Sequence, residues 1–325
     1  MITPVSADLI KEKSARWAEL KAEIRKVIIG QDHVIDRIFI GLLTSGHILL
    51  EGVPGLAKTT LIKTIAQAIG LSFQRIQFTP DLLPADVVGT LIYNQKTQEF
   101  QVKKGPIFAQ MILADEINRA PAKVQSALLE AMQEHQVTIG EDTLRLQEPF
   151  LVLATQNPID QEGTYRLPEA QLDRFMFKVL LTYPKLVEEK EVVTKSFMHH
   201  TVIPILDAQE ILEAQALIKD VYMDDKVLDY ILSLVFSTRN PSDYKLDTLR
   251  TAIAFGASPR ATLALTYAAK AYAFLRKRHF VIPDDVKAIA PDVLRHRITI
   301  SYEAEADGLS ADTIIQALLR TIPAP

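Results

Sequence analysis

The chain has 325 residues, which is longer than one hydrophobic core usually needs, so two domains are expected. Hydrophobic residues make up 48% and charged residues 23%, a balance that excludes extensive disorder. The net charge of -4 gives no overall basic field that would attract nucleic acid, and the absence of cysteine excludes disulfides and thiolate metal sites. Neither a secretory signal nor an apolar stretch long enough to span a bilayer is visible, so we expect a cytoplasmic protein.

The first two-thirds of the chain alternates short apolar runs with helical patterns, which is typical of a parallel sheet covered by helices. The expected strands are residues 48–51, 73–78, 111–114, 150–155 and 175–181. The expected helices are residues 35–43, 58–69, 121–134 and 168–175. Two further segments, residues 87–104 and 136–146, have the pattern of β-hairpins and are either surface decoration or functional insertions.

Beyond Pro184 the pattern changes to helices alone. The expected helices there are residues 207–219, 224–238, 259–276, 283–290 and 310–320. We therefore predict an α/β domain over residues 1–184, which includes an N-terminal helix, and a smaller all-α domain over residues 185–325.

A glycine-rich loop follows the first expected strand and opens a helix. Its sequence over residues 52–59, Gly-Val-Pro-Gly-Leu-Ala-Lys-Thr, indicates a phosphate-binding loop with alanine in place of the usual glycine before the lysine. Backbone N–H groups can wrap a phosphate, Lys58 can reach its outer oxygens, and Thr59 can ligate Mg²⁺. The alternative is a glycine turn whose lysine only faces solvent. The residues expected to bind the nucleotide are Gly52, Val53, Pro54, Gly55, Leu56, Ala57, Lys58, Thr59 and Thr60.

Two acidic residues, Asp115 and Glu116, follow the buried strand at residues 111–114. A carboxylate at the end of a buried strand is costly unless it is paired, and Mg²⁺ held through Thr59 would supply that pairing to Asp115. Glu116 is then placed to polarise a water for attack on the terminal phosphate. Taken alone, such a pair is more often a strand-ending turn, but downstream of a phosphate-binding loop we favour the functional interpretation.

A polar amide, Asn157, follows the expected strand at residues 150–155. Its carbonyl and amide groups could bond both a terminal phosphate oxygen and the attacking water. The alternative is an ordinary turn asparagine before proline. We favour the functional interpretation because this is the third strand end that carries a suitable group.

These segments resemble, in order and spacing, the MoxR family of AAA+ ATPases, from about residue 27 to the carboxyl terminus. The segments that carry the resemblance are residues 52–59, 115–120, 154–158, 167–175 and 256–261. The resemblance implies a P-loop AAA+ fold, with a three-layer parallel-sheet core followed by an all-α lid. One departure is Arg166, where relatives more often carry proline.

The resemblance also implies a ring, normally a hexamer, with Mg²⁺ and ATP bound between subunits. Arg174 matches the arginine finger that a neighbouring subunit contributes, and Arg260 matches the second sensor of the lid. Without the family, Arg174 would be a solvated charge on an amphipathic helix, and Arg260 part of a plain helix start. Ile29 and Gly30 lie in the segment expected near the adenine, and Arg119 is a further candidate group between subunits.

The function that these implications favour is a chaperone-like ATPase that remodels or matures a client protein, including metal or cofactor insertion. The resemblance implies a partner with a von Willebrand factor A domain. A nucleic-acid motor is the alternative, although residues 134–148 carry four acids and one base, which disfavours phosphate binding by that hairpin. A non-hydrolysing switch and a small-molecule kinase fit the complete set of motifs less well.

Overall fold

The computed structural model describes residues 6–53, 55–157, 165, 167–196 and 200–325. Pro54, Pro158 and Arg166, which belong to segments singled out above, lie outside the described residues. Within the described residues no helix is both long enough and apolar enough to cross a membrane.

A five-stranded parallel sheet forms the centre of the protein, in the order β2-β5-β8-β1-β9. All five predicted strands are confirmed, with ends shifted by no more than two residues. The strands are β1 (Ile48–Glu51), β2 (Phe73–Gln77), β5 (Met111–Asp115), β8 (Leu151–Gln156) and β9 (Phe177–Leu180). Strand order differs from chain order, so β1 lies between β8 and β9, with β5 on the far side of β8.

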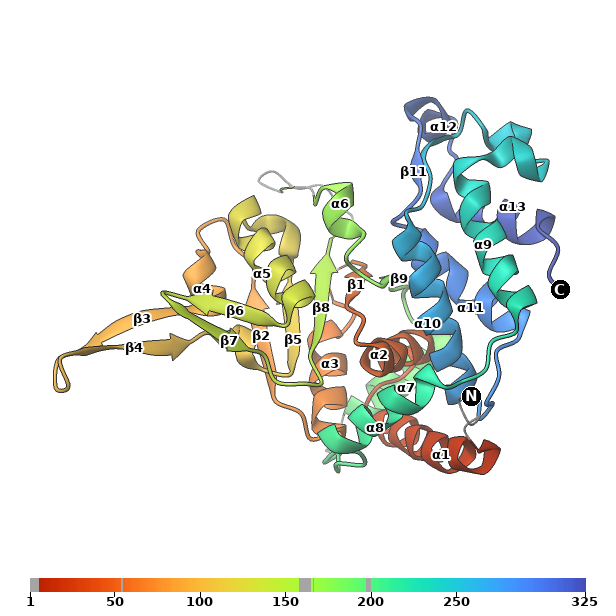
Figure 1. The fold of residues 1–325 in the computed structure, drawn as a ribbon. Helices are drawn as coiled ribbons and strands as arrows, with labels where there is room; N and C mark the ends of the chain where they lie inside the picture. Colours follow the sequence, from red (N-terminus) through yellow and green to blue (C-terminus); the bar gives the residue numbers. More distant parts are fainter. Residues whose placement is uncertain (1–5, 54, 158–164, 166, 197–199) are drawn as a thin grey trace.

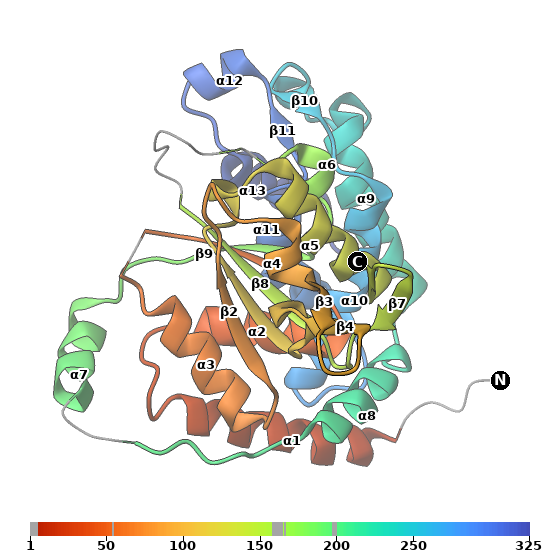
Figure 2. The ribbon, with the colours of Figure 1, turned by 90° about the vertical axis from the view of Figure 1, so that its left-hand side faces the viewer.

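Helices cover both faces of the sheet (Figure 2). On β1, Ile48 and Leu50 point into one apolar cluster and Leu49 into the other, as strand alternation requires. The first cluster packs against α1 (Ala7–Ile24), α2 (Asp32–Thr44) and α3 (Lys58–Ala68), and the second against α4 (Pro84–Val88) and α5 (Ala122–Glu134). The predicted α/β fold with three layers is therefore confirmed.

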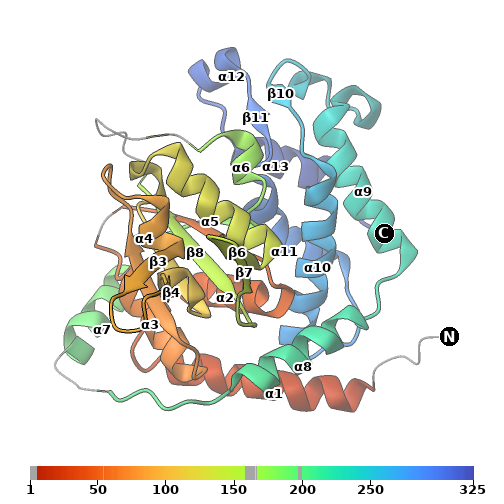
Figure 3. The ribbon, with the colours of Figure 1, turned by 60° about the vertical axis from the view of Figure 1, so that its left-hand side comes forward.

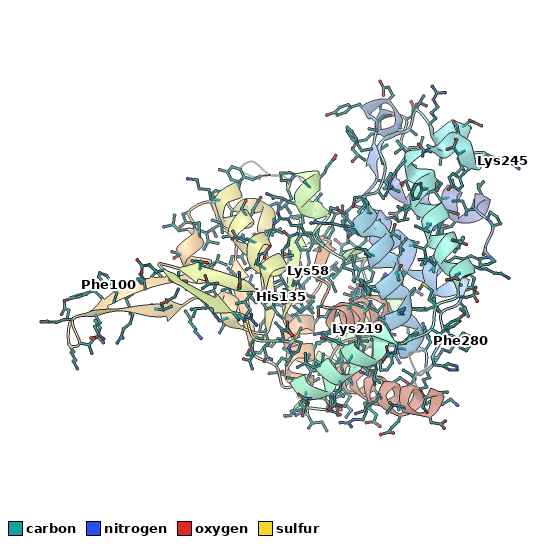
Figure 4. The ribbon with its side chains drawn as sticks, in the orientation of Figure 1. Lys58, Phe100, His135, Lys219, Lys245 and Phe280 are labelled. Atoms are coloured by element: carbon teal, nitrogen blue, oxygen red, sulfur yellow. The ribbon has the colours of Figure 1, made fainter. Side chains whose placement is uncertain are left out.

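Both predicted hairpins are present. They are β3 (Gly89–Asn94) with β4 (Glu99–Lys104), and β6 (Gln136–Ile139) with β7 (Asp142–Arg145). The β3–β4 hairpin projects far from the body of the protein, and its outer part carries Phe100, well away from Lys58 at the centre (Figure 4). Phe100 is 69% exposed, and its ring lies 5.3 Å from that of Tyr93.

The region from α9 to α13, here called the lid, lies on the β9 side of the sheet (Figures 1 and 3). The predicted carboxyl-terminal helices are confirmed as α8 (Ala208–Lys219), α9 (Asp225–Arg239), α10 (Pro259–Leu275), α11 (Pro283–Leu294) and α13 (Ala311–Thr321). The remaining elements are α6 (Glu169–Leu172), α7 (Leu186–Ser196), α12 (Tyr302–Ala306), the ribbon β10 (Ile253–Phe255) with β11 (Thr299–Ile300), and the 3-10 turns η1 (Pro106–Phe108), η2 (Ile117–Arg119), η3 (Pro241–Tyr244) and η4 (Asp247–Leu249).

Three predicted helix boundaries were wrong by three residues or more. The helix predicted to begin at residue 35 begins at Asp32. The helix predicted over residues 168–175 ends at Leu172 because the following residues turn toward β9. The helix predicted to end at Ala290 continues through Pro291 to Leu294. Proline removes only its own N–H from the ladder, and the Pro291 carbonyl still accepts from the N–H of Arg295.

A buried ionic cluster joins the lid to the α/β core. Asp292 of α11 accepts from Arg37 Nε of α2 at 2.7 Å and from Arg295 Nη1 at 2.9 Å, and it pairs with His33 at 3.0 Å. Burial alone would raise the pKa of Asp292, but the His33 hydrogen bond and the Arg37 charge together hold it well below its ordinary value. The ionised carboxylate therefore stabilises the attachment of the lid.

We expect Asp292→Asn to lower the free energy of unfolding at pH 7 by on the order of 3 kcal/mol, because Arg37 would lose its buried counter-charge. The folded-state pKa of Asp292 is depressed, so this stabilisation is present above the unfolded pKa of about 4 and declines as the pH falls below it. Chemical denaturation at several pH values measures the difference. Asp284→Asn on the same helix, an exposed site, should change stability by less than about 0.5 kcal/mol, and an equal loss in both variants would contradict the assignment.

Candidate functional site

The loop between β1 and α3 has the backbone of an anion cradle. Gly55 has φ +89°, and Ala57, at the position before the helix, has φ 52°, also in the left-handed region. These conformations turn the chain sharply from the strand into α3, whose amino terminus then faces the loop. A side chain at Gly52 would approach Leu181 Cβ to 2.8 Å, so glycine is required there for close packing.

Lys58 is half-buried at the start of α3, and its Nζ donates to the carbonyl of Gly52 at 2.6 Å. Burial lowers its pKa, while the nearby charges of Asp115 and Glu116 act in the opposite direction. The ammonium thus lies inside the loop with two carboxylates close by. An anion bound in the loop would replace the Gly52 carbonyl as the partner of this ammonium.

The two acidic residues at the end of β5 are fixed by different partners. Asp115 accepts from Thr155 Oγ1 at 2.6 Å, and from Arg75 Nε at 3.0 Å. Glu116 accepts at one carboxylate oxygen from Gln77 and from Arg119, each at 3.0 Å. Its backbone has φ 56°, a strained conformation for a residue other than glycine, which is more frequent at functional sites than elsewhere.

Thr155, Arg75 and Gln77 contact the acidic pair and were missed by the sequence analysis. The Thr155 hydroxyl donates to Asp115 and also accepts from the backbone N–H of Glu116 at 2.8 Å, so a single side chain fixes both. Gln77 is the parallel-sheet partner of Asp115, which explains its position beside the site. Arg75 and Gln77, two polar residues on either side of the buried Ile76, were a sequence signal of a polar site on β2. Only the strand order shows that they lie beside the acidic pair.

A cavity of about 410 Å³ brings most of the predicted phosphate and metal residues together. Its lining consists of Gly52, Gly55, Leu56, Ala57, Lys58, Thr59, Thr60, Arg75, Gln77, Asp115, Glu116, Thr155 and Asn157. Hydroxyl and carboxylate oxygens are the donors that Mg²⁺ prefers, so Thr59 and Asp115 fit the expected metal. Val53 is absent from the described lining.

A second cavity of about 450 Å³ adjoins the first, since Gly55, Leu56, Ala57 and Thr60 line both. Its other walls are mostly apolar, with Ile28 and Ile29 from the segment after α1, Leu61 from α3 and Val192 from α7. An apolar pocket beside an anion cradle suits a planar base attached to phosphates. Ile29 lines this cavity, whereas Gly30, where an added Cβ would come within 2.8 Å of Glu188 of α7, is absent from the described lining.

The two predicted arginines lie elsewhere. Neither Arg174 nor Arg260 is among the described residues that line either cavity. Arg174 Nε is buried and finds no hydrogen-bond partner within the part of the chain that the structure describes. Arg119, by contrast, contacts Glu116 of its own chain.

Comparison with known proteins gives consistent matches. Residues 47–177 match the ATPase family associated with various cellular activities (AAA), and residues 248–318 match the AAA lid domain. The chain is 47% identical over 304 residues to chaperone MoxR1 of Mycobacterium tuberculosis, covering 93% of this chain and 81% of the relative. It is 32% identical to protein MoxR of Paracoccus denitrificans, covering 97% and 98%. A crystal structure of a protein from Cytophaga hutchinsonii superposes with a TM-score of 0.93 at 51% identity, covering 98% of each chain.

The left-handed backbone at Ala57 leads to a prediction about the cradle. Ala57→Gly should leave the affinity for Mg-ATP unchanged, because glycine adopts φ 52° without strain. Ala57→Val should weaken binding by roughly tenfold, because a β-branched residue disfavours this conformation by about 1–2 kcal/mol, so the free loop relaxes and the strain has to be restored when nucleotide binds. Isothermal titration calorimetry measures both affinities, and equal affinities for the two variants would contradict this coupling of the Ala57 conformation to nucleotide binding.

Proposed function

This chain belongs to the MoxR family of AAA+ ATPases, and on that premise we propose that it couples Mg-ATP hydrolysis in a ring of subunits, a hexamer, to the remodelling of a client protein. Membership of the family makes it an ATP hydrolase with a chaperone-like role. The observation that carries the finer proposal is the convergence of Lys58, the acidic pair and Asn157 on one cavity, while Arg174 lies outside it.

We assign the cavity residues as follows. The loop N–H groups and Lys58 hold the phosphates, and Thr59 and Asp115 hold Mg²⁺, which offsets the negative charge of the phosphates. Glu116 acts as the general base, and Asn157 orients the terminal phosphate and the water. The hydrogen bonds from Gln77 and Arg119 to one Glu116 oxygen support this role, because they hold the carboxylate in a single direction.

Arg174 completes the site of the neighbouring subunit as an arginine finger, and Arg260 acts as the second sensor. The absence of both side chains from the described lining of their own cavities supports a site shared between subunits. A guanidinium at the terminal phosphate offsets charge that develops during phosphoryl transfer. Because Arg119 contacts Glu116 of its own chain, we favour a role for Arg119 in its own site over a role between subunits.

A client protein is a better partner than nucleic acid. The basic cluster of the lid, residues 276–279, is partly engaged within the fold, since Arg278 pairs with Asp285 at 2.8 Å and the Arg276 guanidinium lies over the Tyr272 ring. The exposed Tyr93 and Phe100 of the β3–β4 hairpin instead offer an apolar contact for a protein chain. We extend the proposal to maturation of the client by metal or cofactor insertion, with a von Willebrand factor A domain protein as partner.

We further propose that the nucleotide-binding core ends at Pro184 and that the carboxyl-terminal domain, residues 185–325, which includes the lid, begins there, as the sequence pattern indicates. We also propose that the protein works in the cytoplasm, where ATP is available.

The rate of ATP hydrolysis as a function of protein concentration tests the shared site. Specific activity should rise with concentration as subunits assemble. Lys58→Ala should lose ATP binding, Glu116→Gln should bind without turnover, and Arg174→Ala should bind normally but hydrolyse roughly 10³-fold more slowly. Activity that is independent of concentration and survives the loss of Arg174 would show a self-contained enzyme instead.

Remodelling can be tested by trapping the client. Glu116→Gln should retain ATP and client together in a pull-down, because the cycle stops before hydrolysis. Adding Phe100→Ser should release the client without affecting ATP binding, since the hairpin lies far from Lys58 (Figure 4). Tyr302→Ser, which removes a lid aromatic that is 89% exposed, is the matched control. Recovery of no specific protein, or equal loss with both serine variants, would contradict the proposed contact.

A further inference from the structure

Two hydrogen bonds of Ser258 link the backbone of Arg260 to Asp173, the residue that precedes Arg174. The Ser258 hydroxyl donates to Asp173 Oδ2 at 2.8 Å and also accepts from the backbone N–H of Arg260 at 3.1 Å. Asp173 immediately precedes Arg174, at the end of α6. One hydroxyl group therefore joins the start of the lid helix that carries Arg260 to the residue before Arg174.

A second lid residue, Arg297, holds the same segment. Its Nε donates to Asp173 Oδ1 at 2.8 Å, and its two terminal nitrogens donate to the carbonyls of Phe175 at 2.7 Å and Met176 at 3.0 Å. Arg297 is almost fully buried, and burial lowers its pKa to about 10, against the opposing effect of Asp173. The backbone on both sides of Arg174 is thus fixed by the lid, and not by the sheet alone.

The side chain of Arg174 lacks a comparable attachment. Its Nε has no hydrogen-bond partner among the described residues, although the atom is buried. Without a hydrogen bond at Nε, this long side chain takes its direction mainly from the backbone that carries it. The position of Arg174 therefore depends on Asp173 and, through Ser258, on the lid.

We propose that Asp173 and Ser258 are positioning residues that hold Arg174 and Arg260 as one unit, presented to the nucleotide of the neighbouring subunit. This inference rests on the proposed function, in which Arg174 acts between subunits. Loss of the Ser258–Asp173 hydrogen bond impairs hydrolysis in the neighbouring subunit and leaves nucleotide binding in the mutated subunit intact. A purely structural role for the bond would affect both subunits alike.

Mixed rings of two full-length variants separate these possibilities. Arg174→Ala supplies an intact cradle without a finger, and Lys58→Ala supplies an intact finger without a working cradle. Neither hydrolyses ATP alone, but an equimolar mixture should recover activity where the two meet. Ser258→Ala is then added to one partner or to the other, and the recovered rate is compared.

We expect Ser258→Ala on the Lys58→Ala partner to lower the recovered rate by at least roughly tenfold, because a small misplacement of a catalytic group is costly. The same change on the Arg174→Ala partner should leave the rate and the ATP affinity unchanged. Asp173→Asn should show the same asymmetry. Ser258→Thr, which keeps the hydroxyl, should restore the rate on the finger-donating partner.

Ser310→Ala controls for the loss of a helix cap. Ser310 caps α13 by accepting from the N–H of Thr313 at 3.1 Å, as Ser258 caps α10, but it has no bond to Asp173. On the finger-donating partner it should leave the recovered rate unchanged. Three results with Ser258→Ala would overturn this inference but not the shared site: an equal loss on either partner, no loss on either, or a loss confined to the cradle-donating partner. A parent mixture without activity would refute the shared site, and both proposals with it.

Discussion

Parallel pairing of β5, β8 and β1 is the constraint on which the rest of the site depends. Because the strands run in the same direction, their carboxyl ends meet at one edge, and the residues that follow them must share one space. The loop after β1 brings a half-buried ammonium, β5 brings two carboxylates, and an amide follows β8. Thr155 of β8 then holds Asp115 and Gln77 of β2 holds Glu116, contacts that β5 could not supply alone.

The same constraint explains which parts of the site the sequence could predict. Asp115 and Glu116 directly follow one apolar run. Asn157 and the glycine-rich loop that contains Lys58 come shortly after two others, so the positions of these residues near strand ends could be inferred without knowing the strand order. Thr155 lies within its strand, with 1% of its surface exposed, and a single polar residue in an apolar run carries no comparable signal. Its double hydrogen bond to the acidic pair follows from the pairing of β5 with β8, which only the structure shows.

The fold was predictable to a similar depth. Strands, hairpins and long helices follow from periodicity, whereas α7 and the β10–β11 ribbon do not. The ribbon is too short to show alternation, and its pairing joins residues that are far apart in the chain. Proline 291 was a misleading signal, because a proline inside a buried helix is tolerated when neighbouring packing compensates for the lost bond. Tertiary contacts therefore determine the elements that the local sequence pattern does not predict.

The attachment of the lid has a mechanical consequence. Asp292, Arg37 and Arg295 join α11 to α2 through buried charges, and a continuous apolar cluster extends from α1 across the sheet into α13. An attachment of this kind resists bending, because opening it would separate the buried charges from their partners and expose apolar surface to water. In the proposed ring, each subunit therefore moves as one stiff body, and the flexibility needed for a working stroke lies at the contacts between subunits.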